Sequence, residues 1–204
     1  MQRPGVHIYR REAATKAVLA QEGPTSGVIH LATHGALDRF QPLRSHLRFT
    51  PTKGDDGKLT VEEVFDLRLQ ADLVVLSACE TALARGYTGR PGAASPWQEE
   101  EFPPGDELVG LSRAFMYAGA PTIVASLWKV SDDSTALLMG EFYKNLKTTP
   151  KAEALRQAQL TLMRAEIPLS GVRGIQVTPT QAGQTLRASH PYFWAPFILI
   201  GAGE

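Results

Sequence analysis

Four short apolar runs restrict the fold of this chain more than any other feature of its sequence. Each run is too short for a helix and too continuously apolar for a strand with one face in water. Such runs are typical of strands in a parallel sheet that is covered on both faces. They are VIHLAT (residues 28–33), LVVLSA (73–78), TIVASLW (122–128) and FILIG (197–201). A weaker run at residues 6–10 predicts a further edge strand.

Helical patterns with start and stop signals separate these runs. Thr60 and Glu63 have the spacing of a capping box, and Asp106 can cap a helix that ends at Gly119. Residues 151–166 carry another helical pattern. Strands that alternate with helices indicate right-handed crossovers between parallel strands. The sequence therefore predicts an α/β fold, a three-layer sandwich around a mostly parallel sheet.

Composition narrows the class of protein. The chain has 204 residues, 21 basic and 21 acidic side chains, and one cysteine, Cys79. The length fits one domain over residues 1–204, and the balanced charge gives no long-range field that would attract nucleic acid. A single cysteine excludes an intrachain disulfide and a thiolate metal cluster. Because no run approaches the roughly 20 apolar residues of a membrane span and the first residues lack a secretory signal, we expect a cytoplasmic protein without membrane or direct nucleic-acid partners.

Two reactive side chains follow the first two strong strands. His34 follows residues 28–33, and Cys79 follows residues 73–78. Ligands of open parallel sheets bind beyond the carboxyl ends of the strands. A thiolate next to an imidazole suits acyl transfer, with the main-chain N–H groups of Gly35 and Cys79 as candidate oxyanion donors. The pattern alone favours the alternative of a buried structural cysteine and a structural histidine, since both are common.

Four blocks of sequence occur in an informative order: LATHG (31–35), LSACETA (76–82), GDELVGLSRAFMYAGAPTIVASLWKVSDDST (105–135) and HPYFWAPFILIG (190–201). Together they resemble the CHAT domain, a caspase-like family related to separase and often fused to tetratricopeptide repeats. The resemblance covers nearly the whole chain from residue 12. It implies a caspase-like fold and a cysteine endopeptidase, with His34 as general base, Cys79 as nucleophile and Gly35 at the oxyanion position.

The same resemblance implies a substrate-binding set. Ser126, Leu127 and Trp128 match the strand that pairs with an extended substrate, and Asp106 resembles a position near the specificity pocket that would favour Arg or Lys. Core packing of Trp128 and helix capping by Asp106 remain equally good interpretations.

The chain also departs from the family pattern. A further strand and helix normally precede the matched segment, so we expect an N-terminal strand of the sheet to be missing here. The chain is then the C-terminal portion of a longer protein, is completed by another chain, or is a short family member. Residues 84–105 form a long Gly- and Pro-rich segment after Cys79, and we expect this segment to gate the site.

These features predict a cysteine endopeptidase that cuts a protein or peptide substrate without a cofactor or metal. A regulatory domain or partner chain, such as tetratricopeptide repeats, would control its activity. The alternative is a non-catalytic interaction module that binds a partner strand at the sheet edge. A hydrolase that uses Ser77 is a weaker alternative, because the sequence around Ser77 lacks the spacing of a nucleophile elbow.

Overall fold

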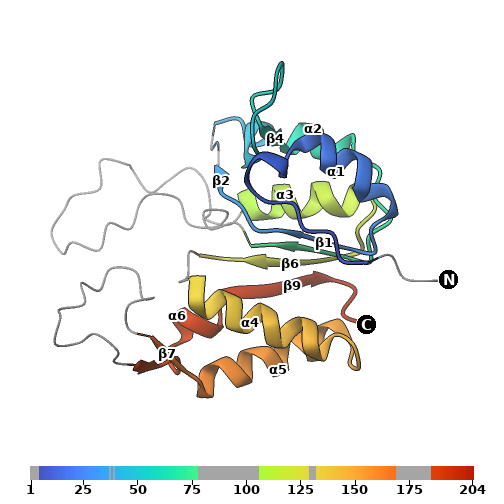
Figure 1. Ribbon diagram of the computed structural model, residues 1–204. Helices are drawn as coiled ribbons and strands as arrows, with labels where there is room; N and C mark the ends of the chain where they lie inside the picture. The colour runs from blue at the N-terminus through green and yellow to red at the C-terminus, as the bar shows by residue number, and fades with distance from the viewer. Residues whose placement is uncertain (1–4, 37, 39, 78–105, 129–131, 169–184) are drawn as a thin grey trace, which may run out of the picture. The chain divides into compact units, whose positions relative to one another are not determined.

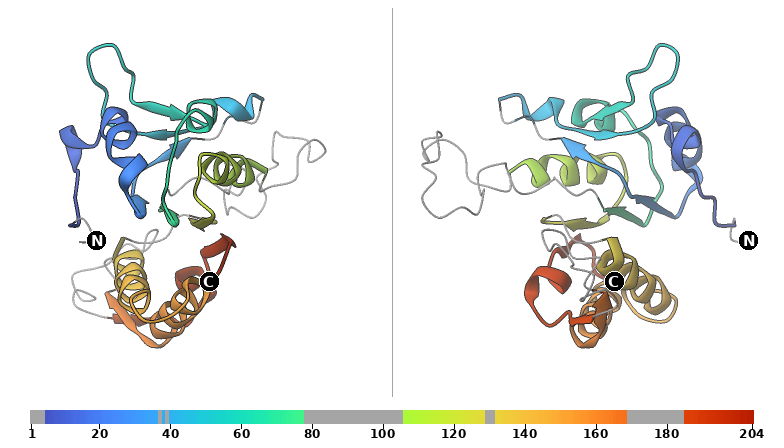
Figure 2. Two further views of the ribbon diagram at one scale, coloured as in Figure 1. Left: turned by 90° about the vertical axis from the view of Figure 1, so that its right-hand side faces the viewer. Right: turned by 60° about the vertical axis from the view of Figure 1, so that its left-hand side comes forward.

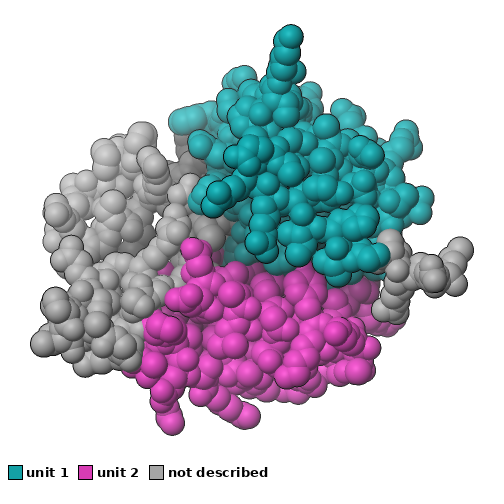
Figure 3. Space-filling view, in the orientation of Figure 1, with its two compact units in different colours: residues 1–127 teal, residues 128–204 magenta. Residues whose placement is uncertain are grey.

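The computed structural model describes residues 5–36, 38, 40–77, 106–128, 132–168 and 185–204, apart from the side chains of residues 106–109. The chain divides into two compact units, Met1–Leu127 and Trp128–Glu204 (Figure 3). Cys79 and the segment 84–105 lie outside the described residues.

A parallel sheet forms the centre of the first unit. The strands β1 (Val28–Leu31), β5 (Leu73–Leu76) and β6 (Thr122–Ser126) are neighbours in this order, and both pairs are parallel. Every residue of β5 and β6 is buried, so neither face of these strands meets solvent. The α/β class and the parallel sheet are therefore confirmed, and three of the four predicted strands lie in this unit.

The helices of the first unit lie on one face of this sheet (Figures 1 and 2). They are α1 (Lys16–Glu22), α2 (Val61–Phe65) and α3 (Asp106–Tyr117). Helix α3 packs on β6, and α2 packs on α3. Val64 of α2 and Leu111 of α3 are fully buried. The chain leaves α3 as predicted at Gly119, whose φ of +117° favours glycine.

A small antiparallel sheet was not predicted. The strands β2 (Gly35–Ala36), β3 (His46–Arg48) and β4 (Lys58–Thr60) pair in this order. Its inner face is apolar, since Leu47 and Leu59 are buried. The strands are only two or three residues long, which is too short to show a clear alternation in the sequence. This sheet continues directly from the chain that leaves β1 through His34.

The predicted capping box at the start of α2 is confirmed. The Thr60 hydroxyl accepts the Glu63 backbone N–H at 3.1 Å, and the Glu63 carboxylate accepts the Thr60 backbone N–H at 2.8 Å. The Lys16 ammonium of α1 donates to Glu63 Oε1 at 2.8 Å and lies 3.1 Å from Asp55 Oδ1. These bonds join α1 to the β3–β4 hairpin and to α2.

Short 3-10 helices complete the first unit, and one sequence prediction there is wrong. They are η1 (Arg11–Ala13), η2 (Gly23–Thr25) and η3 (Pro42–Arg44). The predicted edge strand at residues 6–10 is not a strand. The side chain of Val6 is 90% exposed and that of Ile8 is 67% exposed, so this apolar run buries too little surface to hold a strand in place.

The second unit is mainly helical. Helices α4 (Asp132–Asn145) and α5 (Lys151–Arg164) pack against each other, and α6 (Pro191–Trp194) packs on both. The strands β7 (Glu166–Pro168) and β8 (Thr185–Arg187) form an antiparallel pair, and β9 (Phe197–Gly201) is the fourth predicted strand. The predicted apolar stripe of α5 is buried, at Leu155, Ala158 and Leu162.

Candidate active site

His34 lies between β1 and β2, where the chain passes from the large sheet to the small one. Its side chain is exposed and makes no hydrogen bond among the described residues. Its carbonyl accepts the backbone N–H of Arg48 at 2.8 Å. The Thr33 hydroxyl donates to the Arg48 carbonyl, which ties the neighbouring residue to β3 as well. The backbone around His34 is therefore fixed, while its imidazole remains accessible to a ligand.

The strand that leads to Cys79 is fixed relative to the strand that leads to His34. Leu31 of β1 and Leu76 of β5 are partners in the parallel register. The pairing continues one residue further, because the Ser77 backbone N–H donates to the Leu31 carbonyl at 3.0 Å. Ser77 is the last described residue before the gap that contains Cys79. The two chain segments therefore leave the same edge of the sheet side by side.

Gly35, one of the two residues of the predicted oxyanion pair, begins β2. It is buried and lies opposite Leu47 of β3. Groups alternate along an antiparallel ladder, and the His34 carbonyl already points to β3. The Gly35 N–H therefore points away from β3, and an oxyanion role for it stays a prediction.

The predicted substrate-binding residues differ in their surroundings. Asp106 is the first residue of α3, which agrees with a place at the helix start. Ser126 ends β6 and is 2% exposed, and Leu127 follows it half-buried. Trp128 is also half-buried, and its indole N–H donates to the Tyr192 carbonyl at 3.0 Å. This bond supports a packing role for Trp128, and a substrate role for the set stays a prediction.

No group of three or more His, Cys, Asp or Glu side chains in the described part of the chain is arranged to hold a metal ion. Among the same residues, no helix is long and apolar enough to cross a membrane.

The fold and the site define an α/β protein whose parallel sheet carries an accessible histidine at its carboxyl edge. The family model described as "CHAT domain" matches residues 1–202, and the chain belongs to this family, whose fold is caspase-like and peptidase-related. The predicted resemblance is therefore confirmed.

Two tetratricopeptide repeat proteins are similar to part of this chain. It is 30% identical over 144 residues to Tetratricopeptide repeat protein 28 of Mus musculus and 26% identical over 144 residues to Tetratricopeptide repeat protein 28 of Homo sapiens. These alignments cover 71% of this chain and 4% of each relative, so the chain spans a small part of their length.

Proposed function

We propose that this protein is a cysteine endopeptidase in which Cys79 is the nucleophile and His34 the general base. The observation that carries the proposal is the register of β1 and β5. Leu31 and Leu76 are partners, and the two reactive residues each follow their strand partner by three positions. Two peptide units span at most about 7 Å, so Cys79 stays within that distance of Ser77 at the sheet edge.

The reaction needs only groups of this chain and water. The Cys79 thiol gives its proton to His34, and the thiolate attacks the scissile carbonyl. The tetrahedral oxyanion receives hydrogen bonds from the N–H groups of Gly35 and Cys79. His34 then gives the proton to the leaving amine, which leaves an acyl-enzyme. Water hydrolyses this thioester with His34 as base, and the thiol is restored.

The remaining parts of the proposal concern substrate and control. Ser126, Leu127 and Trp128 would pair with an extended substrate, and Asp106 would favour a basic residue in it. Residues 1–204 would act as one domain in the cytoplasm. A regulatory domain or partner chain, of which tetratricopeptide repeats are the type suggested by the names of the relatives, would hold the activity in check.

One observation favours the alternative of a non-catalytic interaction module. No described residue holds the His34 ring by a hydrogen bond. Catalytic histidines are usually oriented by such a partner. A module of this kind would bind a partner strand at the sheet edge and would cut nothing.

Profiling of a peptide library with the full chain separates these functions. The wild type should cut, Cys79→Ala should cut nothing, and His34→Ala should be slowed by about a hundredfold or more, the usual contribution of a general base. Ser77→Ala is the matched control near the nucleophile and should still cut. Equal cutting by wild type and Cys79→Ala would exclude the assigned nucleophile. A folded wild type that cuts no peptide in the library would favour the interaction module.

A further inference from the structure

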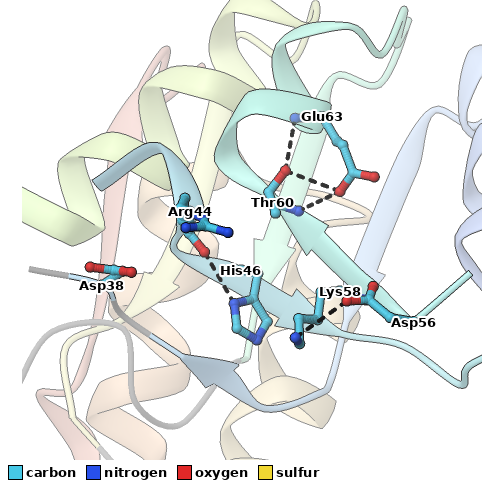
Figure 4. Close-up of a pocket in the computed structure, with 7 residues that line it drawn as sticks. All are labelled: Asp38, Arg44, His46, Asp56, Lys58, Thr60 and Glu63. Atoms are coloured by element: carbon cyan, nitrogen blue, oxygen red, sulfur yellow. Dashed lines mark hydrogen bonds and ion pairs between the residues drawn. The ribbon is translucent and has the colours of Figure 1, made fainter. Parts of the chain in front are cut away.

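A polar pocket lies on the outer face of the small sheet (Figure 4). Its volume is about 410 Å³, and all the described residues that line it are polar or charged. The lining side chains are basic at Arg44, His46 and Lys58 and acidic at Asp38, Asp56 and Glu63, and they include Thr60. A lining of this kind disfavours an apolar ligand group. Such a group would displace water from the polar side chains and would form no hydrogen bonds in its place.

The pocket and His34 share one face of the small sheet. In the ladder, Ala36 faces His46 and His46 faces Thr60, while Arg48 faces Lys58. Residues directly opposite each other on antiparallel strands have side chains on the same face. The backbone bond from Arg48 to the His34 carbonyl extends this ladder by one position. His34 therefore begins the row that contains Arg48 and Lys58, and His46 lies in the next row on the same side.

Burial supports this assignment of faces. Gly35 and Leu47, which alternate with these residues, are buried, whereas His34 and Arg48 are exposed. Rows on one face are separated by two residues, or about 7 Å at 3.3 Å per residue. We therefore consider an extended peptide whose reacting bond lies at His34. The side chain that reaches the pocket belongs to a residue two or three positions away from that bond.

The carboxylates of the pocket already have partners within the protein. Glu63 accepts from Lys16 and from the backbone and hydroxyl of Thr60. Asp38 Oδ1 accepts the backbone N–H groups of Phe40 and Gln41.

The third carboxylate, Asp56, has two contacts with Lys58. It accepts the Lys58 backbone N–H at 2.9 Å, and its Oδ2 lies 3.3 Å from the Lys58 ammonium. The Asp56–Lys58 pair is open to solvent, with 61% and 53% of the side chains exposed, so a ligand can compete for this ammonium at little cost.

The basic side chains, in contrast, have donors to spare. Arg44 has five N–H donors, and among the described residues its side chain donates once, from Nη1 to Gln41 Oε1 at 3.0 Å. His46 Nδ1 lies 3.1 Å from the Arg44 carbonyl. A carbonyl only accepts, so Nδ1 is the protonated nitrogen in this contact, and Nε2 of the neutral ring is an acceptor that supplies no donor to an anion. Satisfied acceptors and unused donors together favour an anionic group.

We propose that this pocket is a specificity subsite that binds an acidic side chain of the peptide substrate, two or three residues from the bond that is cut. Arg44 and Lys58 supply the positive charge and the hydrogen-bond donors. This inference rests on the proposed peptidase function for the identity of the ligand. The residues that line the pocket do not include His34 or Cys79.

Peptide pools test the subsite directly. Each pool carries Glu, Gln or Lys at one fixed position and mixtures elsewhere, and cleavage by the full chain is measured. At one position the Glu pool should be cut about tenfold faster than the Gln pool, and the Lys pool more slowly than either. Arg44→Gln and Lys58→Gln should each lower the Glu/Gln ratio by about threefold or more, because each removes one charge partner.

Two further variants make the result specific. Lys53→Gln is the matched control, since Lys53 is an exposed lysine in the hairpin turn closed by Thr52 and Asp55 and does not line the pocket. It should leave the ratio unchanged. Asp56→Asn should raise the ratio, because it frees the Lys58 ammonium and removes a negative charge. A merely structural role of the pocket residues would not produce these opposite changes. The subsite is excluded if no position prefers Glu, or if the preference survives in both Arg44→Gln and Lys58→Gln.

Binding separates failure of the subsite from failure of the peptidase proposal. The same pools, labelled with a fluorophore, are titrated against the Cys79→Ala chain, and polarisation is measured. A Glu preference that Lys58→Gln lowers supports the subsite even when the wild type cuts nothing. Equal binding of the Glu and Gln pools overturns the subsite, whether or not the wild type cuts peptides.

Discussion

Leu31 and Leu76 are in-register partners in two parallel strands, and this pairing aligns the ends of β1 and β5. Beyond Leu31 the chain continues to His34, which is exposed, and beyond Leu76 it continues through Ser77 toward Cys79. Since both segments leave one edge of the sheet, an imidazole and a thiol are expected within reach of each other. This expectation can be tested without any substrate.

Alkylation of Cys79 by iodoacetamide measures the influence of His34 on the thiol. An ordinary thiol has a pKa of about 8.5 and is almost entirely protonated at pH 6, whereas a nearby protonated imidazole favours the thiolate. At pH 6 the wild type should react about tenfold faster than His34→Ala. His7→Ala is the matched control, because His7 lies in the exposed N-terminal segment and pairs with Glu22. Identical rates for the wild type and His34→Ala would contradict the dyad.

The capping box predicts the effect of Thr60→Ala. The Thr60 hydroxyl accepts the N–H of Glu63 in the first turn of α2, and alanine cannot replace this bond. The expected loss in the free energy of unfolding is about 1 kcal/mol, or a fall in melting temperature of roughly 2–4 °C. Thr52→Ala, in the exposed hairpin turn, should melt within about 1 °C of the wild type. Thermal unfolding followed by circular dichroism measures both, and an equal effect of the two changes would argue against the cap.

The pair of Lys16 and Glu63 predicts a dependence of stability on pH. Burial raises the pKa of Glu63, but hydrogen bonds from Lys16 and Thr60 together lower it by more than burial raises it. The pKa of Glu63 therefore lies below its ordinary value of 4.5. A carboxylate with a lowered pKa stabilises the fold above its unfolded pKa, and this stability is lost as the pH falls through the folded pKa. Urea unfolding should therefore show a gap between wild type and Glu63→Gln at pH 7 that closes toward pH 3.

Glu62→Gln provides the control for this titration. Glu62 is the neighbouring residue in α2, and its side chain is exposed. The gap between the wild type and Glu62→Gln should be small at pH 7. A gap for Glu63→Gln that stays constant between pH 7 and pH 3 would show that ionisation of Glu63 does not stabilise the fold.

The backbone conformation of Gly119, after the end of α3, predicts a large loss of stability when a side chain is added there. Its φ is +117°, and a Cβ atom there would lie 2.1 Å from the Leu69 carbonyl oxygen. Gly119→Ala should destabilise the protein by about 3 kcal/mol or more, since strain and a clash with backbone add together. Gly110→Ala in the same helix meets no atom within 4 Å and should stabilise it by about 0.5–1 kcal/mol. Urea midpoints of the two variants should move in opposite directions.

The sequence predicts the parts of this fold that depend on local signals and on long apolar patterns. The capping box at Thr60, the end of α3 at Gly119 and the four predicted strands are of this kind. Burial on both faces holds for β5 and β6, whereas β1 exposes alternate residues. The small sheet was missed because its strands are short and its inward residues, such as Leu47, are buried by tertiary contacts. Residues 6–10 show the reverse case, in which an apolar run is not a strand.

The candidate site likewise has one part that the sequence predicts and one part that it does not. His34 is predictable because a strand pattern ends just before it, and the structure finds it exposed at that edge. The pocket around His46 and Lys58 has no signature in the sequence, since its residues come from two loops, a 3-10 helix, two short strands and an α-helix. Their proximity follows from the pairing of β3 with β4, which is a tertiary property. Spacing along the chain carries no information on it.

Trp128 and Trp194 provide a matched pair for the proposed substrate strand. Each indole N–H donates to a backbone carbonyl at 3.0 Å, that of Tyr192 and that of Ser189 respectively. Changing either tryptophan to phenylalanine removes one hydrogen bond, so each variant should lose about 1 kcal/mol of stability. If the segment 126–128 also pairs with substrate, only Trp128→Phe should raise KM for a cleaved peptide, by about threefold, with kcat nearly unchanged. Equal losses of stability with an unchanged KM in both variants would assign Trp128 to packing alone.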